Sequence, residues 1–236
     1  MQYTNIISID PSTTCTGLCI NSELYCFAAE DSVKTKKGKY KKWFGIADQA
    51  CTIITYSNSS IKNQSFSDSE IEKLKKYNIM TEKIVDTIKI NTQFKNSICL
   101  IEGYSYNSAA GNLIDLVTYS TLLRYKLHTN GVHVVAIPPT TLKMAAAKLT
   151  YPPIDIGKKK PKLEWRNSSG VAAGSFKKHE IYKAIIENTT LEDTWAKLLR
   201  EYASDQLNAK DIPKPFNDIN DSYVLYHGYQ AGHINT

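Results

Sequence analysis

Residues 6–20 read IISIDPSTTCTGLCI, an apolar run that ends at the carboxylate of Asp10, then a polar turn and a second apolar run. A third run, ELYCFAAE at 23–30, follows a short turn that contains Asn and Ser. Short apolar runs separated by turn-forming residues are typical of neighbouring strands. The start of the chain therefore predicts three antiparallel strands, with Asp10 at the end of the first.

The rest of the chain alternates helical and strand-like patterns. An amphipathic pattern begins near Asp68, SICLIEG predicts a buried strand that ends at Glu102, and HVVAIPP predicts a strand covered on both faces. Helices are predicted over NLIDLVTYSTLLRYKLHT, TTLKMAAAK, KKHEIYKAIIEN, LEDTWAKLLREYA and NDINDSYVLYHGYQA. This order predicts an α/β fold with a mixed five-stranded sheet, three antiparallel strands and then two parallel ones, flanked by helices.

The composition fits one domain with insertions. Of the 236 residues, 42% are hydrophobic, enough for one full core, so we expect a single domain over 1–236. A polar, lysine-rich insertion at about 30–67 is expected to be partly loop. A second insertion, at about 150–176, is rich in proline, glycine and lysine, and this predicts a mobile basic loop without regular elements.

The charge balance narrows the class of partner. A formal net charge of +6 favours polyanions such as nucleic acid, although a membrane surface or an acidic protein stays compatible with it. No run approaches the roughly 18–20 apolar residues of a spanning helix and the polar start is unlike a signal peptide, so we expect a cytoplasmic protein. The five cysteines form no CxxC pair, which argues against a disulfide framework or a structural zinc site.

Four acidic residues carry the chemical prediction. Asp10 and Glu102 each end a strand, where a mixed α/β sheet presents its ligand groups, and Asp218 and Asp221 share one face at the start of a helix. Such oxygen-only ligands suit Mg²⁺, with Mn²⁺ as a substitute, and two ions per site can hydrolyse a phosphodiester. Alternatively, the strand-end acids are turn formers and the helical pair caps its helix.

The acidic motifs also carry a resemblance. IISIDPSTTCTGLCI, CLIEGYSYN and NDINDSYVLYHGY resemble the acidic motifs of RuvC-type Holliday junction resolvases, which are RNase H-like nucleases. The resemblance implies that Asp10, Glu102, Asp218 and Asp221 bind metal. It also implies a catalytic lysine at Lys178, with Lys177 as the second choice, and a homodimer that acts on branched DNA. The size and the insertions look more like phage or other viral members, which would place the protein in the host cytoplasm.

Basic and aromatic residues around these motifs are candidate DNA contacts. The family's aromatic wedge lies just after its acidic strand, where this chain has Tyr104 and Tyr106. The second insertion and its surroundings combine phosphate-binding and stacking side chains, although a solvated loop is an equal alternative. With Lys177, the predicted contacts there are Lys143, Lys148, Lys158, Lys159, Lys160, Lys162, Trp165 and Arg166.

These observations lead to one mechanism and two rivals. In the mechanism, Asp10 bridges two Mg²⁺ ions, Glu102 and Asp221 are further ligands, Asp218 is a ligand or a water-orienting base, and Lys178 stabilises charge on the phosphate. One rival is an actin-like ATPase or sugar kinase, because DPSTTCTG also resembles the phosphate-binding turn of that superfamily. The other is a catalytically inactive DNA-binding module. Of the histidines, His227 is the one candidate for a role at the site, because it lies one to two turns beyond Asp221 on the same predicted helix.

Overall fold

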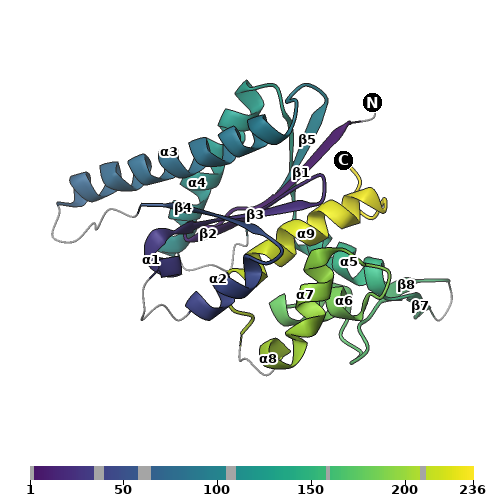
Figure 1. Cartoon of the computed structure of the whole chain (residues 1–236). Helices are drawn as coiled ribbons and strands as arrows, with labels where there is room; N and C mark the ends of the chain where they lie inside the picture. The colour runs from purple at the N-terminus through teal and green to yellow at the C-terminus, as the bar shows by residue number, and fades with distance from the viewer. Residues whose placement is uncertain (1–2, 35–39, 58–64, 105–109, 158–159, 208–210) are drawn as a thin grey trace.

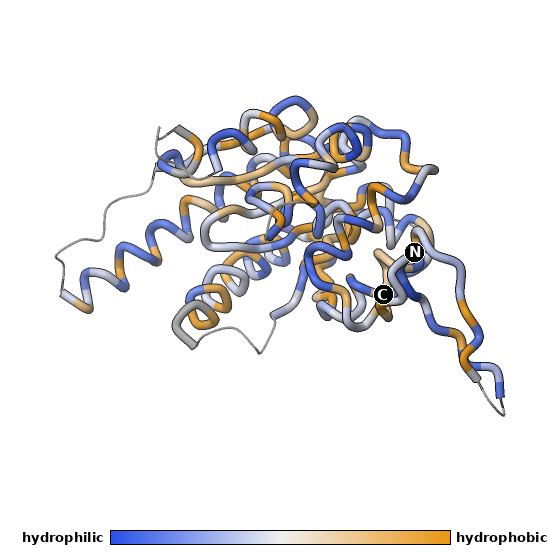
Figure 2. The backbone as a smooth tube through the Cα atoms, turned by 90° about the horizontal axis from the view of Figure 1, so that it is seen from below, coloured by the Kyte–Doolittle hydropathy of each residue, from blue (hydrophilic) through white to orange (hydrophobic). Residues whose placement is uncertain are grey.

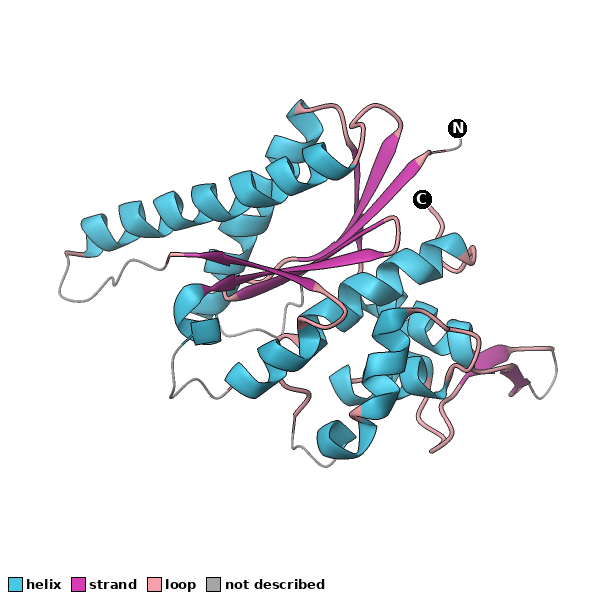
Figure 3. Ribbon diagram, in the orientation of Figure 1, coloured by secondary structure: helices cyan, strands magenta, loops and turns pink. Residues whose placement is uncertain are grey.

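The computed structural model describes residues 3–34, 40–57, 65–104, 110–157, 160–207 and 211–236. Its main sheet has six strands in the order β4-β3-β2-β1-β5-β6. The strands are β1 (Asn5–Asp10), β2 (Cys15–Ile20), β3 (Glu23–Ala29), β4 (Thr52–Tyr56), β5 (Ser97–Glu102) and β6 (His133–Ile137). The longer helices are α3 (Phe66–Asn91), α4 (Ala110–Thr129), α5 (Pro139–Thr150), α6 (Lys178–Glu187), α7 (Thr194–Glu201) and α9 (Phe216–Gln230) (Figures 1 and 3).

The strand directions define the fold class. β2 is antiparallel to both β1 and β3, whereas β5 is parallel to β1, β6 to β5 and β4 to β3. Strands β1, β2, β3, β5 and β6 are the predicted five, in the predicted order along the chain. With only β2 reversed and β1 in the middle, the protein has the mixed α/β sheet of the RNase H-like fold.

Helices cover both faces of the sheet. On one face, Ile7 and Ile9 of β1 pack with the buried sides of α3 and α4. On the other face, the alternate residues of β2 and β5 pack against α5, α6, α7 and α9. Figure 1 shows this three-layer arrangement, with α3 and α4 on one side of the sheet and α9 along the other. Because side chains alternate along a strand, Ser8 and Asp10 point away from Ile7 and Ile9, towards α9.

The predicted strand count was wrong by one, because the first insertion contributes β4 at the edge of the sheet. This segment also contains α1 (Glu30–Lys34) and α2 (Lys41–Ala47), whose Phe44 and Ile46 are buried. β4 was missed because most of its residues are only partly buried, so its burial pattern is weak. The strand β6 is also an edge strand, partly exposed along most of its length, and not covered on both faces as predicted.

The second insertion contains regular elements that its composition did not predict. Strands β7 (Pro153–Asp155) and β8 (Leu163–Trp165) pair as a small antiparallel sheet, and Arg166 and Ala172 form a further bridge. This β7–β8 hairpin projects from the body of the molecule (Figure 2). A short 3-10 turn at Ala173–Ser175 leads into α6, and α8 (Ala203–Leu207) follows α7. No helix in the described part of the chain is long and apolar enough to cross a membrane.

Candidate metal centre

Two neighbouring strands bring the first two carboxylates together. β1 and β5 are parallel, and Ile9 pairs with Ile101, so one step further along the same register Asp10 lies beside Glu102. Both strands are apolar up to these residues, and both acids stand at the carboxyl ends of their strands. The sequence prediction that Asp10 and Glu102 end adjacent strands is therefore confirmed, and both side chains face α9.

The last helix supplies the other two carboxylates. Asp218 and Asp221 lie in the first turns of α9, and both residues are buried. Two contacts fix this helix on the sheet: the Ser8 hydroxyl donates to the carbonyl of Ser222 at 2.6 Å, and Gly17 of β2 lies directly under the first turn. A Cβ atom at position 17 would stand 2.1 Å from the carbonyl oxygen of Asp218, so only glycine permits this approach.

Three of the four acids form a group with the geometry of a cation site. Asp10, Glu102 and Asp221 each offer a carboxylate oxygen, and these atoms lie within 4.8 Å of one another. Asp218 is not one of these three, but it lies three residues before Asp221 in α9. The carboxylate of Asp10 is near enough to contribute to the raised pKa of Asp218. The structure thus brings together all four acids that the sequence singled out.

Burial and repulsion between carboxylates favour the protonated forms of Glu102 and Asp218 in the absence of a cation. Burial, reinforced by the neighbouring Asp10 carboxylate, raises the pKa of Glu102 well above its usual value. Burial raises the pKa of Asp218 to about 6, although Lys214 opposes the shift. A cation bound among these side chains would restore the charged forms.

Lys178 stands among the carboxylates, as the resemblance implies. It is the first residue of α6, its Nζ donates to Asp221 Oδ2, and it lies 3.8 Å from Asp10 Oδ2. Burial alone lowers the pKa of Lys178, but the carboxylates of Asp10, Glu102 and Asp218 outweigh burial and raise it. The Lys178 side chain is 45% exposed, so part of it faces the solvent while its ammonium contacts the acids.

A second lysine at the site was missed by the sequence reasoning. Lys214, four residues before Asp218, donates to Ser12 Oγ at 3.3 Å and to Thr14 Oγ1, and its Nζ lies 3.8 Å from Asp218 Oδ2. Ser12 and Thr14 belong to the turn after Asp10. The only sequence signal was a lysine one helical turn before the DxxD motif, and such lysines are common on surfaces.

The carboxylates fit divalent cations. Asp218 Oδ2 and Asp221 Oδ1 are buried and have no hydrogen-bond partner among the described residues. An unpaired buried carboxylate oxygen is costly, and a cation is the partner that removes this cost. The donors are all oxygens, which Mg²⁺ and Mn²⁺ accept and which zinc sites rarely use alone.

The candidate wedge residue Tyr104 lies two residues beyond Glu102 and is held by α4. The Arg124 guanidinium donates to the Tyr104 hydroxyl and lies 5.1 Å from the centre of its ring. The Tyr104 hydroxyl also lies 3.3 Å from Thr121 Oγ1. Tyr106 lies outside the described residues, so the structure orients Tyr104 alone.

The predicted basic contacts of the second insertion lie away from the carboxylates. The base of the β7–β8 hairpin contacts Glu187, which accepts hydrogen bonds from Tyr151 at 2.7 Å and from Ser168 at 3.0 Å. Glu187 ends α6 and Lys178 begins it, so about 15 Å of helix separates them. Proximity in sequence to Lys178 therefore does not place the hairpin beside it.

Several of the hairpin's predicted DNA contacts already have partners within the protein. Lys148 Nζ lies 4.9 Å above the Trp165 ring, and Arg166 pairs with Glu164 at 2.5 Å. Lys160, Lys162 and Lys177 are exposed, Lys143 is partly buried on α5, and Lys158 and Lys159 fall outside the described part.

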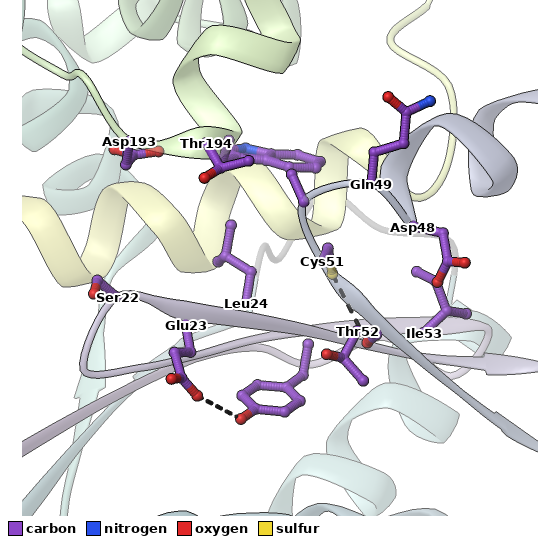
Figure 4. Close-up of a pocket in the computed structure, with 13 residues that line it drawn as sticks. Ser22, Glu23, Leu24, Asp48, Gln49, Cys51, Thr52, Ile53, Asp193 and Thr194 are labelled. Carbon is purple, nitrogen blue, oxygen red and sulfur yellow. Dashed lines mark hydrogen bonds between the residues drawn. The ribbon is translucent and has the colours of Figure 1, made fainter.

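His227 and one sizeable cavity lie apart from the carboxylate site. The centres of the His227 and Tyr223 rings lie 4.2 Å apart, with the ring planes tilted by 49°. His227 Nε2 lies 3.9 Å from Asp193 Oδ2, and burial lowers the pKa of His227. A cavity of about 700 Å³, lined by Glu23, Asp193 and others, opens where β3 and β4 begin (Figure 4). Because β3 runs parallel to β1, this cavity lies at the opposite end of the sheet from Asp10.

The fold and the carboxylate cluster define an RNase H-like protein with a candidate metal centre. Among solved structures, the chain is similar over nearly its whole length to RuvC Holliday junction resolvases. It covers 97% of its own length and 96% of a Thermus thermophilus RuvC structure, with 11% identity and a TM-score of 0.47. For T. thermophilus RuvC in complex with a Holliday junction substrate, the coverages are 96% and 92%, the identity is 9% and the TM-score is 0.45. No protein-family model and no curated protein matches the sequence.

Proposed function

We propose that this protein is a Mg²⁺-dependent endonuclease that cuts four-way or otherwise branched DNA. One observation carries the proposal: the oxygens of Asp10, Glu102 and Asp221 gather within 4.8 Å, beside buried carboxylate oxygens that lack hydrogen-bond partners. Acids that only cap a helix or form a turn have no reason to converge in this way. The described part of the chain has one main sheet of this kind, whereas the actin-like rival requires two such domains.

The residues that would hold the metal follow from their positions. Asp10, Glu102 and Asp221 would hold the metal, because their carboxylate oxygens lie within 4.8 Å of one another. Two divalent ions, when bound, supply an activated water and stabilise the leaving oxygen of a phosphodiester. Asp218, whose pKa is raised to about 6, is suited to hold or orient that water as a ligand or a base.

The lysine of α6 completes the proposed chemistry. Lys178 Nζ stands beside Asp10 and Asp221 while nearly half of its side chain remains exposed. An ammonium in this position can donate to a phosphate oxygen and stabilise the charge that develops there during hydrolysis. The cut strands would then carry 5′-phosphate and 3′-hydroxyl ends.

The choice of a branched substrate rests on the sequence motifs that resemble RuvC-type resolvases. A homodimer would place two carboxylate sites on opposite strands of a junction. Tyr104 and Tyr106, the exposed lysines and Arg166 are the proposed contacts to the DNA arms.

The first experiment tests for divalent-dependent cleavage of a synthetic four-way junction. Wild-type protein should cut the junction in Mg²⁺ and not in EDTA. Asp10→Asn should abolish cutting while it retains junction binding, because the amide keeps the side-chain shape but loses the ligand charge. A variant of exposed Lys197, Lys197→Ala, controls for nonspecific effects, since its side chain is 61% exposed on α7. Retained cutting by Asp10→Asn would overturn the assignment.

A further inference from the structure

The turn between β1 and β2 forms a hydrogen-bonded cluster with Lys214 that the chemistry assigned above does not use. We propose that Ser12, Thr14 and Lys214 bind a phosphate of the cut DNA strand next to the scissile one. The proposal rests on the proposed nuclease function and adds a substrate-binding subsite to it. It starts from the hydrogen bonds of Lys214 with Ser12 Oγ and Thr14 Oγ1.

Lys214 makes its hydrogen bonds to hydroxyl groups and forms only a longer ion pair with the acid beside it. Its Nζ lies 3.8 Å from Asp218 Oδ2, beyond hydrogen-bond distance, and this oxygen has no hydrogen-bond partner among the described residues. A lysine placed only to neutralise Asp218 would donate to that carboxylate. The Lys214 side chain is 28% exposed, so solvent reaches part of it.

The two hydroxyls accept from Lys214 and can still donate to a ligand. Both oxygens accept from Lys214, so their own protons are available to a further acceptor. The two oxygens lie 3.4 Å apart, so a bond between them occupies at most one of these protons. An ammonium beside two hydroxyls, at least one of which has a proton free to donate, can bind the oxygens of a phosphate.

The turn that carries the hydroxyls is fixed before any ligand arrives. The Ser12 backbone N–H donates to Thr16 Oγ1 at 3.2 Å, and Thr16 Oγ1 donates back to the Ser12 carbonyl at 2.9 Å. Thr16 Oγ1 also lies 2.8 Å from the Tyr119 hydroxyl of α4, in the core. Binding therefore needs little ordering of this turn, which favours affinity.

In this proposal, Lys178 and Lys214 bind two successive phosphates of the substrate strand. Lys178 contacts Asp10 and Asp221, whereas Lys214 lies on the side of Asp218. A strand whose scissile phosphate lies at Lys178 would continue past Asp218 with its next phosphate at Lys214. The repulsion between a DNA strand and the carboxylates is then offset on both sides of the cut.

The test measures junction binding against salt in an Asp10→Asn background, where the DNA stays intact. Lys214→Ala should weaken binding about fivefold and reduce the slope of log K against log salt by about 1, the amount expected for one phosphate contact. Lys214→Arg should restore the slope. The double variant Ser12→Ala with Thr14→Val should weaken binding while it keeps the lysine, so the result does not depend on one variant folding. Lys197→Ala should leave the slope unchanged.

A scan of neutral methylphosphonates along the cut strand locates the contact. With Lys214 present, one substitution beside the scissile position should weaken binding. With Lys214→Ala, that substitution should cost nothing further, because both changes remove the same interaction. If Lys214→Ala keeps the full slope and the full penalty at every position, the phosphate subsite is refuted. If the wild-type protein neither binds nor cuts branched DNA, the proposed function itself fails.

Discussion

At the scale of single residues, the carboxylate site is built at the expense of stability. Asp218 is buried beside other acids, and its pKa is raised to about 6 from an ordinary value of 3.8. A raised carboxyl pKa means that the folded state binds a proton more tightly than the unfolded state does. The stabilising effect of that proton is complete below about pH 4 and is lost as the pH rises through 6.

Asp218→Asn should therefore stabilise the metal-free protein. In EDTA at about pH 7.5, we expect the melting temperature to rise by on the order of 5 °C, because the amide removes a buried charge of the size that two pKa units imply. At about pH 5, the gain should shrink, since Asp218 itself is then mostly protonated. Exposed Asp211→Asn is the control and should change neither temperature. A lower melting temperature for Asp218→Asn at neutral pH would contradict this account of the site.

Mg²⁺ should stabilise the wild-type protein more as the pH rises. Cation ligands must be deprotonated, and the pKa values of Glu102 and Asp218 are both raised. We expect millimolar Mg²⁺ to raise the melting temperature clearly at about pH 7.5 and only slightly at about pH 5. The measurement is a thermal melt with and without Mg²⁺ at each pH. Equal increments at the two pH values would show that the ion binds elsewhere.

The sequence singled out the acids that the structure brings together, but it did not single out Lys214. Asp10 and Glu102 each follow an apolar run, and a run of that kind shows both the strand and the end at which the side chain emerges. Lys214 and the hydroxyls of Ser12 and Thr14 meet only because the segment before α9 returns to the first turn. No local pattern records a contact between residues 200 positions apart.

At the scale of secondary-structure elements, α9 decides whether the site exists. This helix crosses the sheet over β1 and β2, and its first turn rests on Gly17. Asn220 of α9 also accepts a hydrogen bond of 3.0 Å from the indole N–H of Trp195. This contact ties α7 to α9. The position of Asp218 and Asp221 therefore depends on how closely α9 approaches β2.

Gly17→Ala should displace α9 and reduce both stability and cleavage. The added methyl group would stand 2.1 Å from the Asp218 carbonyl oxygen and 2.6 Å from its carbon, and neither backbone atom can yield without moving the helix. We expect the unfolding free energy to fall by about 3 kcal/mol, at the upper end of the usual range for overpacked sites. Denaturant unfolding would measure the loss of stability, and cleavage of a four-way junction in Mg²⁺ would measure the loss of activity.

Gly45→Ala is the matched control. Gly45 lies inside α2, and a Cβ atom there would meet nothing within 4 Å. Alanine is favoured over glycine within helices, so this variant should gain up to about 1 kcal/mol and keep full cleavage. Similar losses in the two variants would show that the approach of α9 at Gly17 is not the cause.

The elements that the sequence did not predict are those with little buried apolar surface. β7 is fully exposed and β8 is at most partly buried, so neither shows the alternation that a half-buried strand produces. The hairpin forms through backbone pairing and through Asp155, whose carboxylate accepts from the N–H groups of Gly157 and Lys162. Proline and glycine in this segment serve the turn and do not prevent the strands.

At the scale of the whole molecule, the basic residues proposed to contact DNA lie at two separate places. Lys178 and Lys214 flank the carboxylates, whereas the hairpin lies at the far end of α6, about 15 Å from Lys178. A long polyanion can contact both places, but a mononucleotide cannot. This spacing favours DNA over a small phosphorylated substrate.

Neutralising the hairpin should weaken binding without affecting the chemical step. Replacing Lys158, Lys159 and Lys160 with alanine should lower junction affinity and flatten its salt dependence by up to about 3 in slope, one for each lost phosphate contact. Cleavage at saturating protein should stay near the wild-type rate, because the described part of the hairpin packs at the far end of α6 from Lys178. An unchanged salt slope would exclude the hairpin as a DNA contact.

The docking of α9 on Gly17 has a consequence for how the protein comes into being. Two of the four acids belong to α9, near the end of the sequence, and the other two belong to β1 and β5. While the ribosome is still translating, a growing chain that lacks α9 lacks Asp218 and Asp221, and so two of the four acids of the candidate centre. Under the proposed nuclease function, a product that terminates before α9 should therefore not cleave DNA.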